Sequence, residues 1–199
     1  MARPRKYDDD EILDRAMETF WRRGWNSTSI RDLELALDLK APSIYRRFGS
    51  KDELGAAVVD HYTDRVIVRR VGKLLPGTGD PVANIAMFLD RSVTEADDGG
   101  GLWGCLLTTA SLEVREPGVG LGLALQRGHA VVEQGLRREV ERAASLGRLA
   151  PGVDSVAATA TLTLVMQGLM ALARGGSPSA ELRRRARAAV SVLTTDAVD

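Results

Sequence analysis

Apolar residues near the start of the chain recur at the spacing of a helix. Ile12, Ala16 and Phe20 lie four residues apart, and the positions beside them widen the apolar stripe with Leu13, Met17 and Trp21. A stripe of this period predicts an amphipathic helix over 8–23. Acidic residues fill its first turn, where the helix dipole favours negative charge, and Gly24 stands where the helix should end.

Two short helices with a break between them are predicted next. Ser29 and Asp32 fit the Ser-x-x-acid capping pattern, so a helix should begin at 28 or 29. Asp38 ends it, and Pro42 falls in the first turn of the following helix, where proline is tolerated. The side chains expected to face inward from this pair are Ile30, Leu33, Leu37, Ile44 and Phe48.

Proline and glycine mark the ends of the helices predicted in the rest of the chain. A capping box formed by Ser50 and Glu53 starts a long helix, and DDGGG at 97–101 predicts a flexible loop. Few β-branched runs occur, and aromatic residues make up only 5% of the chain, which favours an all-α fold. About nine helices are expected, the last six covering about 51–74, 81–96, 102–115, 119–146, 153–174 and 178–194.

The second short helix carries a local excess of positive charge. The chain has 27 basic and 27 acidic residues, so its zero net charge argues against a uniformly basic nucleic-acid coat. The segment Lys40–Lys51 nevertheless holds four basic residues and no acidic one, a local charge of +4. A helix-turn-helix presents such a face to DNA. The most exposed face of the segment is expected to carry six side chains, with Tyr45 at its edge: Lys40, Ser43, Tyr45, Arg46, Arg47 and Lys51.

A longer pattern at fixed spacing links these elements to a known family. It consists of Gly24-Trp25, Thr28-Ser29, Asp32-Leu33, Ala36, Ser43-Ile44-Tyr45, Phe48, Ser50-Lys51 and Leu54. With this pattern, about the first 60 residues resemble the TetR family of bacterial transcriptional regulators. The resemblance implies a three-helix, helix-turn-helix DNA-binding domain over 1–50 and a larger helical ligand-binding and dimerisation domain over 51–199. GCLL at 104–107 also resembles a sequence that recurs in some TetR-like regulatory domains.

Four positions depart from the usual pattern of that family. Alanine often stands where this chain has Glu34, a small residue at Leu37, and serine or threonine at Lys40. Glycine usually holds the turn position of Asp38. Aspartate tolerates the left-handed conformation better than most non-glycine residues, so the turn should survive.

The resemblance implies DNA contacts for individual residues. Ser29 and Arg31 match positions that usually meet phosphate or a base edge, and 40–43 would enter the major groove. Tyr45 and Lys51 would hold phosphates, while the two adjacent arginines would divide between bases and backbone. Arginine can bind guanine through two hydrogen bonds, which supports this assignment independently. The expected interface comprises Thr28, Ser29, Arg31, Lys40, Ala41, Pro42, Ser43, Tyr45, Arg46, Arg47 and Lys51.

The last two helices are expected to form a homodimer interface, which the resemblance implies is a four-helix bundle. No charged residue occurs in 155–173, and its small residues permit close approach of another helix: Ala157, Ala158, Ala160, Gly168 and Ala171. The length of this stretch also fits a membrane span, but its several polar residues fit a buried interface better. The following helix has one apolar face, and the opposite face is expected to be solvated through Arg183, Arg184, Arg185 and Arg187.

A ligand pocket is implied among the fourth to eighth helices, and no cofactor is expected. Because few candidate lining residues are polar, a hydrophobic or amphipathic effector is favoured over a phosphorylated one. Methionines at helical spacing are also common in plain cores. The candidates are His61, Tyr62, Met87, Phe88, Trp103, Cys105, Met166, Gln167 and Met170.

Cys105, the only cysteine, has two interpretations. An exposed thiol with a lowered pKa would make it a redox or electrophile sensor, whereas a buried one would be a small apolar core residue. A single cysteine also excludes an internal disulfide and fits a reducing cytoplasm. His129 and Glu133 lie one helical turn apart, but two ligands are too few to predict a metal site.

The leading functional hypothesis is a ligand-responsive, dimeric DNA-binding regulator, with repression expected and activation as the alternative. An enzyme with an appended helix-turn-helix lacks support, because neither a glycine-rich phosphate loop nor a paired zinc-ligand motif occurs. A protein-interaction module would offer the same basic face to an acidic partner, but only a regulator predicts a palindromic DNA site. Arg3, Arg5 and Lys6 form a basic segment that either stays solvated or follows the DNA.

Overall fold

The structure is a computed structural model, and the part of the chain that it describes is built from helices. It describes residues 8–94 and 104–195, so the basic N-terminal segment, the predicted loop at 97–101 and Trp103 lie outside it. One isolated β-bridge joins Leu149 and Thr194. The all-α prediction is confirmed. The elements are α1 (Asp9–Arg23), α2 (Ile30–Leu37), α3 (Ala41–Phe48), α4 (Lys51–Tyr62), the π-helical segment Thr63–Val68, α5 (Arg69–Leu74), α6 (Pro81–Thr94), α7 (Leu106–Glu113), α8 (Val119–Ser145), α9 (Ser155–Arg174) and α10 (Ser179–Leu193).

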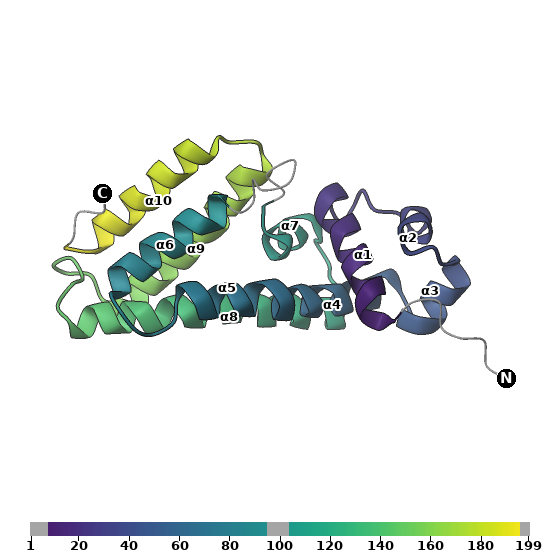
Figure 1. The fold of residues 1–199 in the computed structure, drawn as a ribbon, viewed down its shortest axis with the longest axis horizontal. Coiled ribbons are helices and arrows are strands. Elements are labelled where there is room, and N and C mark those ends of the chain that lie inside the picture. Colours follow the sequence, from purple (N-terminus) through teal and green to yellow (C-terminus); the bar gives the residue numbers. More distant parts are fainter. Residues whose placement is uncertain (1–7, 95–103, 196–199) are drawn as a thin grey trace.

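The first three helices pack together as a head at one end of the molecule (Figure 1). Phe20 of α1 is fully buried and stacks on Trp25, with ring centroids 4.5 Å apart. Leu33 of α2 and Ile44 of α3 are also fully buried in this core. Side chains predicted to face inward therefore build the head. Two of them are half-buried at its edge, Ile30 and Phe48.

Local hydrogen bonds set the ends of the head helices. The Ser29 amide donates to Asp32 Oδ2 at 2.8 Å, and the Asp32 amide donates to Ser29 Oγ at 3.2 Å, which completes the predicted capping box. Asp38 adopts a left-handed conformation with φ of 51°. The turn between α2 and α3 therefore forms with aspartate in place of glycine, as expected.

The helix predicted over 51–74 forms, but its middle is not α-helical. Residues Thr63–Val68 are π-helical, and the flanking residues Tyr62 and Arg69 keep helical backbone angles, so α4 and α5 stay continuous with this segment. With this run counted once, the described residues form nine helices. A π-helical turn inserts an extra residue into the helical ladder, and no periodicity in the sequence indicated it.

The predicted start of the helix at 102–115 needs a correction. In the structure α7 begins at Leu106, because Gly104 takes a left-handed φ of 68° and Cys105 is extended. The other boundaries predicted for the body agree with the structure to within a few residues.

The long helix α8 runs beside the α4–α5 run along the length of the body, with α6, α9 and α10 packed on the far part (Figure 1). Two glycines of α8 let neighbouring elements approach closely. A Cβ at Gly135 would lie 2.7 Å from Val71 Cγ1, and one at Gly128 would lie 2.7 Å from Leu107 Cδ2. Real Cβ atoms do not approach other atoms this closely, so side chains at these positions would push the helices apart.

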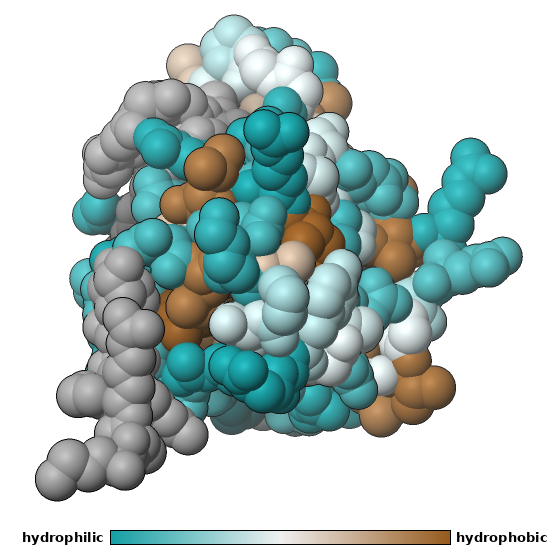
Figure 2. Space-filling view, turned by 90° about the vertical axis from the view of Figure 1, so that its right-hand side faces the viewer, coloured by the Kyte–Doolittle hydropathy of each residue, from teal (hydrophilic) through white to brown (hydrophobic). Residues whose placement is uncertain are grey.

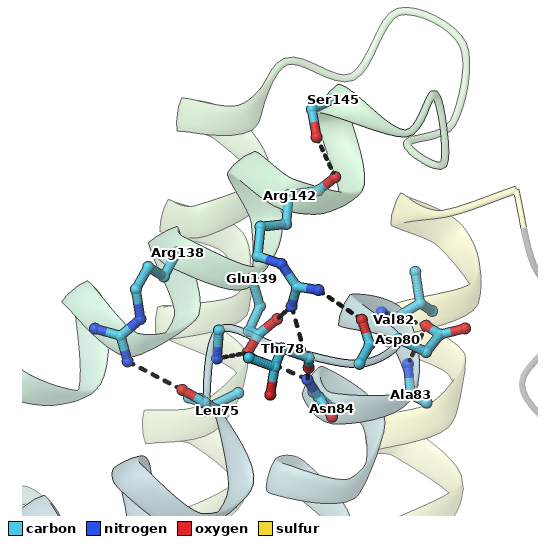
Figure 3. A network of polar contacts seen from close by, with 12 residues as sticks. Leu75, Thr78, Asp80, Val82, Ala83, Asn84, Arg138, Glu139, Arg142 and Ser145 are labelled. Carbon is cyan, nitrogen blue, oxygen red and sulfur yellow. Dashed lines mark hydrogen bonds and ion pairs between the residues drawn. The ribbon is translucent and has the colours of Figure 1, made fainter.

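A buried carboxylate pins the α5–α6 loop to α8 (Figure 3). The fully buried Glu139 accepts hydrogen bonds from the Gly77 amide at 2.7 Å and from Asn84 Nδ2 at 3.2 Å, and it forms an ion pair with Arg142. Arg142 also donates to the Thr78 carbonyl at 3.3 Å. Because a buried carboxylate needs several partners to offset its desolvation, this network fixes the loop.

Candidate nucleic-acid interface and ligand cavity

Helix α3 directs a polar face outward at the end of the molecule shown in Figure 2. Ile44 is buried, whereas Pro42, Tyr45 and Arg46 are exposed and Ser43 is half-buried. Hydrophilic side chains cover most of this end, with smaller hydrophobic areas between them. A guanidinium, a phenol and a hydroxyl on one short helix can donate to phosphates and base edges.

The start of α2 contributes to the same surface, although not through every predicted residue. Thr28 is fully buried, and its Oγ1 donates to the Gly24 carbonyl at 2.6 Å, so its hydroxyl has a structural role. The hydrogen bond from the Ser29 side chain is the main reason that the pKa of Asp32 is lowered. Three of the predicted DNA contacts that precede α3 are exposed: Ser29, Arg31 and Lys40.

Two of the four basic residues in the Lys40–Lys51 segment turn toward the protein itself. Arg47 forms an ion pair with Asp9 in the acidic first turn of α1. Lys51 Nζ donates to the Trp25 carbonyl at 2.8 Å and lies 5.5 Å from the centre of the Trp25 ring. Burial lowers the pKa of Lys51. The outward directions predicted for Arg47 and Lys51 are not observed, because residue spacing does not reveal the carboxylate opposite Arg47 or the carbonyl and ring beside Lys51.

Sequence reasoning missed a residue that shapes this surface. Glu34 Oε1 accepts a hydrogen bond of 2.7 Å from the amide of Ala41, the first residue of α3. Lys40, at the N-cap position of α3, makes no capping hydrogen bond with its side chain. Glu34 therefore supplies from α2 the cap that α3 lacks. The sequence did contain a signal for this role, because Glu34 stands where the family usually has alanine.

Direct hydrogen bonds join the head to the two ends of α7. Trp21 Nε1 donates to the Gly104 carbonyl at 2.9 Å. Asn26 Nδ2 donates to the Glu113 carbonyl at 2.9 Å. The position of α7 is thereby coupled to α1 and to the turn before α2.

A small internal cavity of about 20 Å³ lies where the α4–α5 run meets α6, α7, α8 and α9. Four of the predicted ligand-binding residues line it together: Phe88, Cys105, Met166 and Gln167. Tyr62 is fully buried beside them, and its hydroxyl donates to Cys105 Sγ at 3.7 Å. Burial raises the pKa of Tyr62 well above its usual value, so its hydroxyl stays protonated.

Three other predicted lining residues lie elsewhere, and Trp103 is outside the described residues. His61 Nε2 lies 2.7 Å from Asp14 Oδ1 and so ties α4 to α1. Met87 is 52% exposed on the outer side of α6, and Met170 is buried away from the cavity. Helical spacing assigned these residues to faces but could not show which face borders the cavity.

The sensor interpretation of Cys105 stays a prediction. Its side chain is buried and accepts a hydrogen bond from the Tyr62 hydroxyl, whereas a sensor needs a thiol that an oxidant or electrophile can reach. The described residues contain no group of three or more potential metal ligands. His129 Nε2 instead lies 3.0 Å from Ser111 Oγ, and Glu133 pairs with Arg137 at 2.7 Å.

One face of α9 exposes apolar and small residues at a spacing of four: Val156, Ala160, Leu164, Gly168 and Leu172. By length and composition α9 could cross a membrane, but its other face packs against α6, α7, α8 and α10. Only 39% of its most apolar stretch is buried in the single chain. The predicted dimer interface would cover this apolar face.

Known proteins similar to this chain are bacterial regulators. Residues 12–58 match the family described as "Bacterial regulatory proteins, tetR family". The HTH-type transcriptional repressor ComR of Escherichia coli strain K12 is 28% identical over 183 residues, which cover 88% of this chain and 84% of that protein. The HTH-type transcriptional repressor BdcR of the same strain is 24% identical, over 98% of this chain and 93% of that protein. A solved structure of the TetR family transcriptional regulator CifR, a cysteine mutant complexed with 26-base-pair operator DNA and apo-CifR, is 28% identical with a TM-score of 0.82, over 95% of this chain and 98% of that one.

Proposed function

Because this chain is a member of the TetR family of bacterial transcriptional regulators, we propose that it is a cytoplasmic repressor. It binds a palindromic operator as a homodimer, and a small hydrophobic effector releases it from that DNA. The observation that carries this proposal is the exposed polar face of α3, held on a head whose core and caps leave that face free. Two relatives of this chain are named as repressors, which favours repression over activation.

Tyr45 and Arg46 are the side chains of α3 best placed for operator contact. Both are exposed, and Arg46 carries a guanidinium that can bind guanine through two hydrogen bonds. The Tyr45 hydroxyl suits a phosphate. CifR, a protein of the same fold, is complexed with operator DNA in its solved structure, which supports a role of this kind for the head.

The exposed face of α9 favours a homodimer formed through α9 and α10. A two-fold dimer would place two α3 helices about one turn of DNA apart, roughly 34–36 Å, or farther apart for a longer operator. Such symmetry requires a palindromic or nearly palindromic site.

An effector would act by stabilising a dimer whose heads are wrongly spaced for the operator. A tenfold loss of operator affinity needs only about 1.4 kcal/mol of difference between the two states. The continuous run from α4 to α5 extends from the head to the cavity, and α7 joins the cavity to α1 through the Trp21–Gly104 hydrogen bond.

The test begins by sequencing genomic DNA fragments that the purified protein retains, which should contain a shared palindrome. On that operator, Arg46→Ala should weaken binding by about 1–3 kcal/mol, and Tyr45→Phe should weaken it by less, because only one hydroxyl contact is lost. Arg184→Ala, at an exposed position of α10, is the matched control. Wild-type operator affinity of both α3 variants in a gel-shift assay would contradict the assigned contacts. Retention of DNA without any shared sequence would contradict the regulator itself.

A further inference from the structure

The internal cavity is too small to hold an organic effector. Its volume of about 20 Å³ leaves room for about one water molecule. Sites for small organic ligands usually measure about 300–1,000 Å³. Effector binding must therefore use another space or one that opens from this cavity.

A larger groove lies on the outer side of the same cavity wall. It measures about 470 Å³, and it shares three residues with the cavity: Thr108 of α7, His129 of α8 and Gln167 of α9. These side chains thus separate the groove from the cavity. A molecule in the groove would touch the elements that surround both spaces, including α7, which is hydrogen-bonded to the head.

The walls of the groove define the kind of ligand that fits it. No lysine, arginine, aspartate or glutamate lines it among the described residues, and burial lowers the pKa of His129, which keeps its ring neutral near pH 7. The side chains of Thr108 and Gln167 make no hydrogen bond within the part of the chain that the structure describes, so their polar groups can serve a ligand. The remaining walls are largely apolar or small, with Leu112, Leu164, Gly168 and Ala171.

The open side of the groove belongs to the uncovered face of α9. Leu164 and Gly168 line the groove and also stand in the exposed apolar stripe of that helix. A Cβ at Gly168 would meet nothing within 4 Å in the single chain, so space remains there for a second molecule. The segment 155–173 contains no charge, and water is a poor environment for so apolar a helix face. A second copy of the chain, which the proposed function places on α9, would close the groove.

We propose that the effector site is this groove between α7, α8 and α9, closed by a second copy of the chain, and that its ligand is an uncharged, mainly apolar molecule with a hydrogen-bonding group. This inference rests on the proposed homodimer. Gln167 and Thr108 bind the polar group of the ligand, and Leu112 and Leu164 cover its apolar part. Because both chains enclose the ligand, its binding changes the packing of the two α9 helices and hence the spacing of the heads.

The experiment uses the full-length protein and the dye Nile red, an uncharged apolar molecule with a carbonyl acceptor. Wild-type protein should bind Nile red saturably and more tightly than the anionic dye anilinonaphthalene sulfonate. Ala171→Leu fills the groove, and Gln167→Leu removes its polar partner at similar volume. Each should weaken Nile red binding about tenfold or more, or about 1.4 kcal/mol. Ala144→Leu, the same substitution at an exposed end of α8, should bind the dye like wild type.

Sedimentation measured with and without the dye tests whether the second copy of the chain helps to form the site. Bound Nile red should shift the monomer–dimer equilibrium toward the dimer, since a ligand stabilises the state that binds it better. The groove assignment is overturned if both variants bind the dye like wild type. It is equally overturned if the dye favours the monomer, which would show that side chains of the second copy fill the groove. Retention of a palindromic operator is measured on the same samples, so failure of the groove can be distinguished from failure of the proposed function.

Discussion

Several residues of the head owe their roles to a neighbour that is distant in the sequence. Lys51 and Trp25 illustrate this. The Lys51 ammonium donates a hydrogen bond to the Trp25 carbonyl and lies over the Trp25 ring. Trp25 also lies against Gly55 of α4, where a Cβ would overlap the indole ring. Gly55 therefore allows α4 to approach the head, and the indole ring occupies the space that a side chain would need.

At this scale we predict that Gly55→Ala destabilises the protein. Overpacking of a filled core costs about 1–3 kcal/mol, and Trp25 is too large to move aside freely. Gly72→Ala is the matched control, since Gly72 is exposed on α5 with nothing near its Cβ position, and alanine there should stabilise the helix by up to about 1 kcal/mol. Urea unfolding monitors both. Equal stability of the two variants would contradict the close contact at Trp25.

Among the elements, the short helix α3 depends on support from its neighbours. It is eight residues long, and isolated helices of that length are unstable in water. Its apolar side chains are held by the head core, and its first turn is capped by Glu34 from α2. The candidate DNA interface is thus positioned by the Glu34 carboxylate, whose negative charge would itself repel DNA phosphates.

For this element we predict that Glu34→Ala loosens α3 and lowers sequence discrimination. Loss of the cap should reduce the free energy of unfolding by about 1 kcal/mol, while the lost negative charge strengthens binding to random DNA. The ratio of operator affinity to random-DNA affinity should fall in gel-shift titrations. Glu34→Gln keeps an acceptor for the Ala41 amide and should lose less stability. The control is Glu141→Ala, an exposed acidic residue of α8, and the prediction fails if that variant loses as much discrimination as Glu34→Ala.

The sequence predicted most helix ends well and the interior of the α4–α5 run poorly. Caps such as the Ser29–Asp32 pair act over a few residues, so they can be recognised without the fold. The π-helical segment Thr63–Val68 leaves no comparable local signal. Likewise, the left-handed conformation of Gly104, just before the extended Cys105 and the start of α7, is one that a glycine permits but does not require.

At the scale of the whole molecule, the chain has no net charge, and one face of its apolar helix α9 is exposed. The net charge is zero, so no overall repulsion opposes association of two copies. In the proposed homodimer the exposed stripe of α9 is the contact between the two copies, and the proposed effector groove lies at the edge of that stripe.

At the scale of the molecule we predict that Ala160→Glu prevents dimer formation. Ala160 is exposed in the single chain, so the monomer should lose no more than about 0.5 kcal/mol, whereas an unpaired charge buried between two copies costs several kcal/mol. Light scattering should report a monomer, and operator binding should weaken strongly because each head then binds alone. Ala144→Glu, exposed on α8, should remain dimeric. A dimeric Ala160→Glu protein would place the interface elsewhere.

The sequence by itself determined the helices, the family and the exposed position of Arg46, because periodicity, capping pairs and the spacing of the head residues are local properties. Only the tertiary structure decided that Arg47 pairs with Asp9, that His61 binds Asp14 and that Met87 faces outward. It also showed that the internal cavity is small and that a larger groove lies outside it. These features depend on which helices lie opposite one another, and contacts between residues so distant along the chain leave no periodic trace in one sequence.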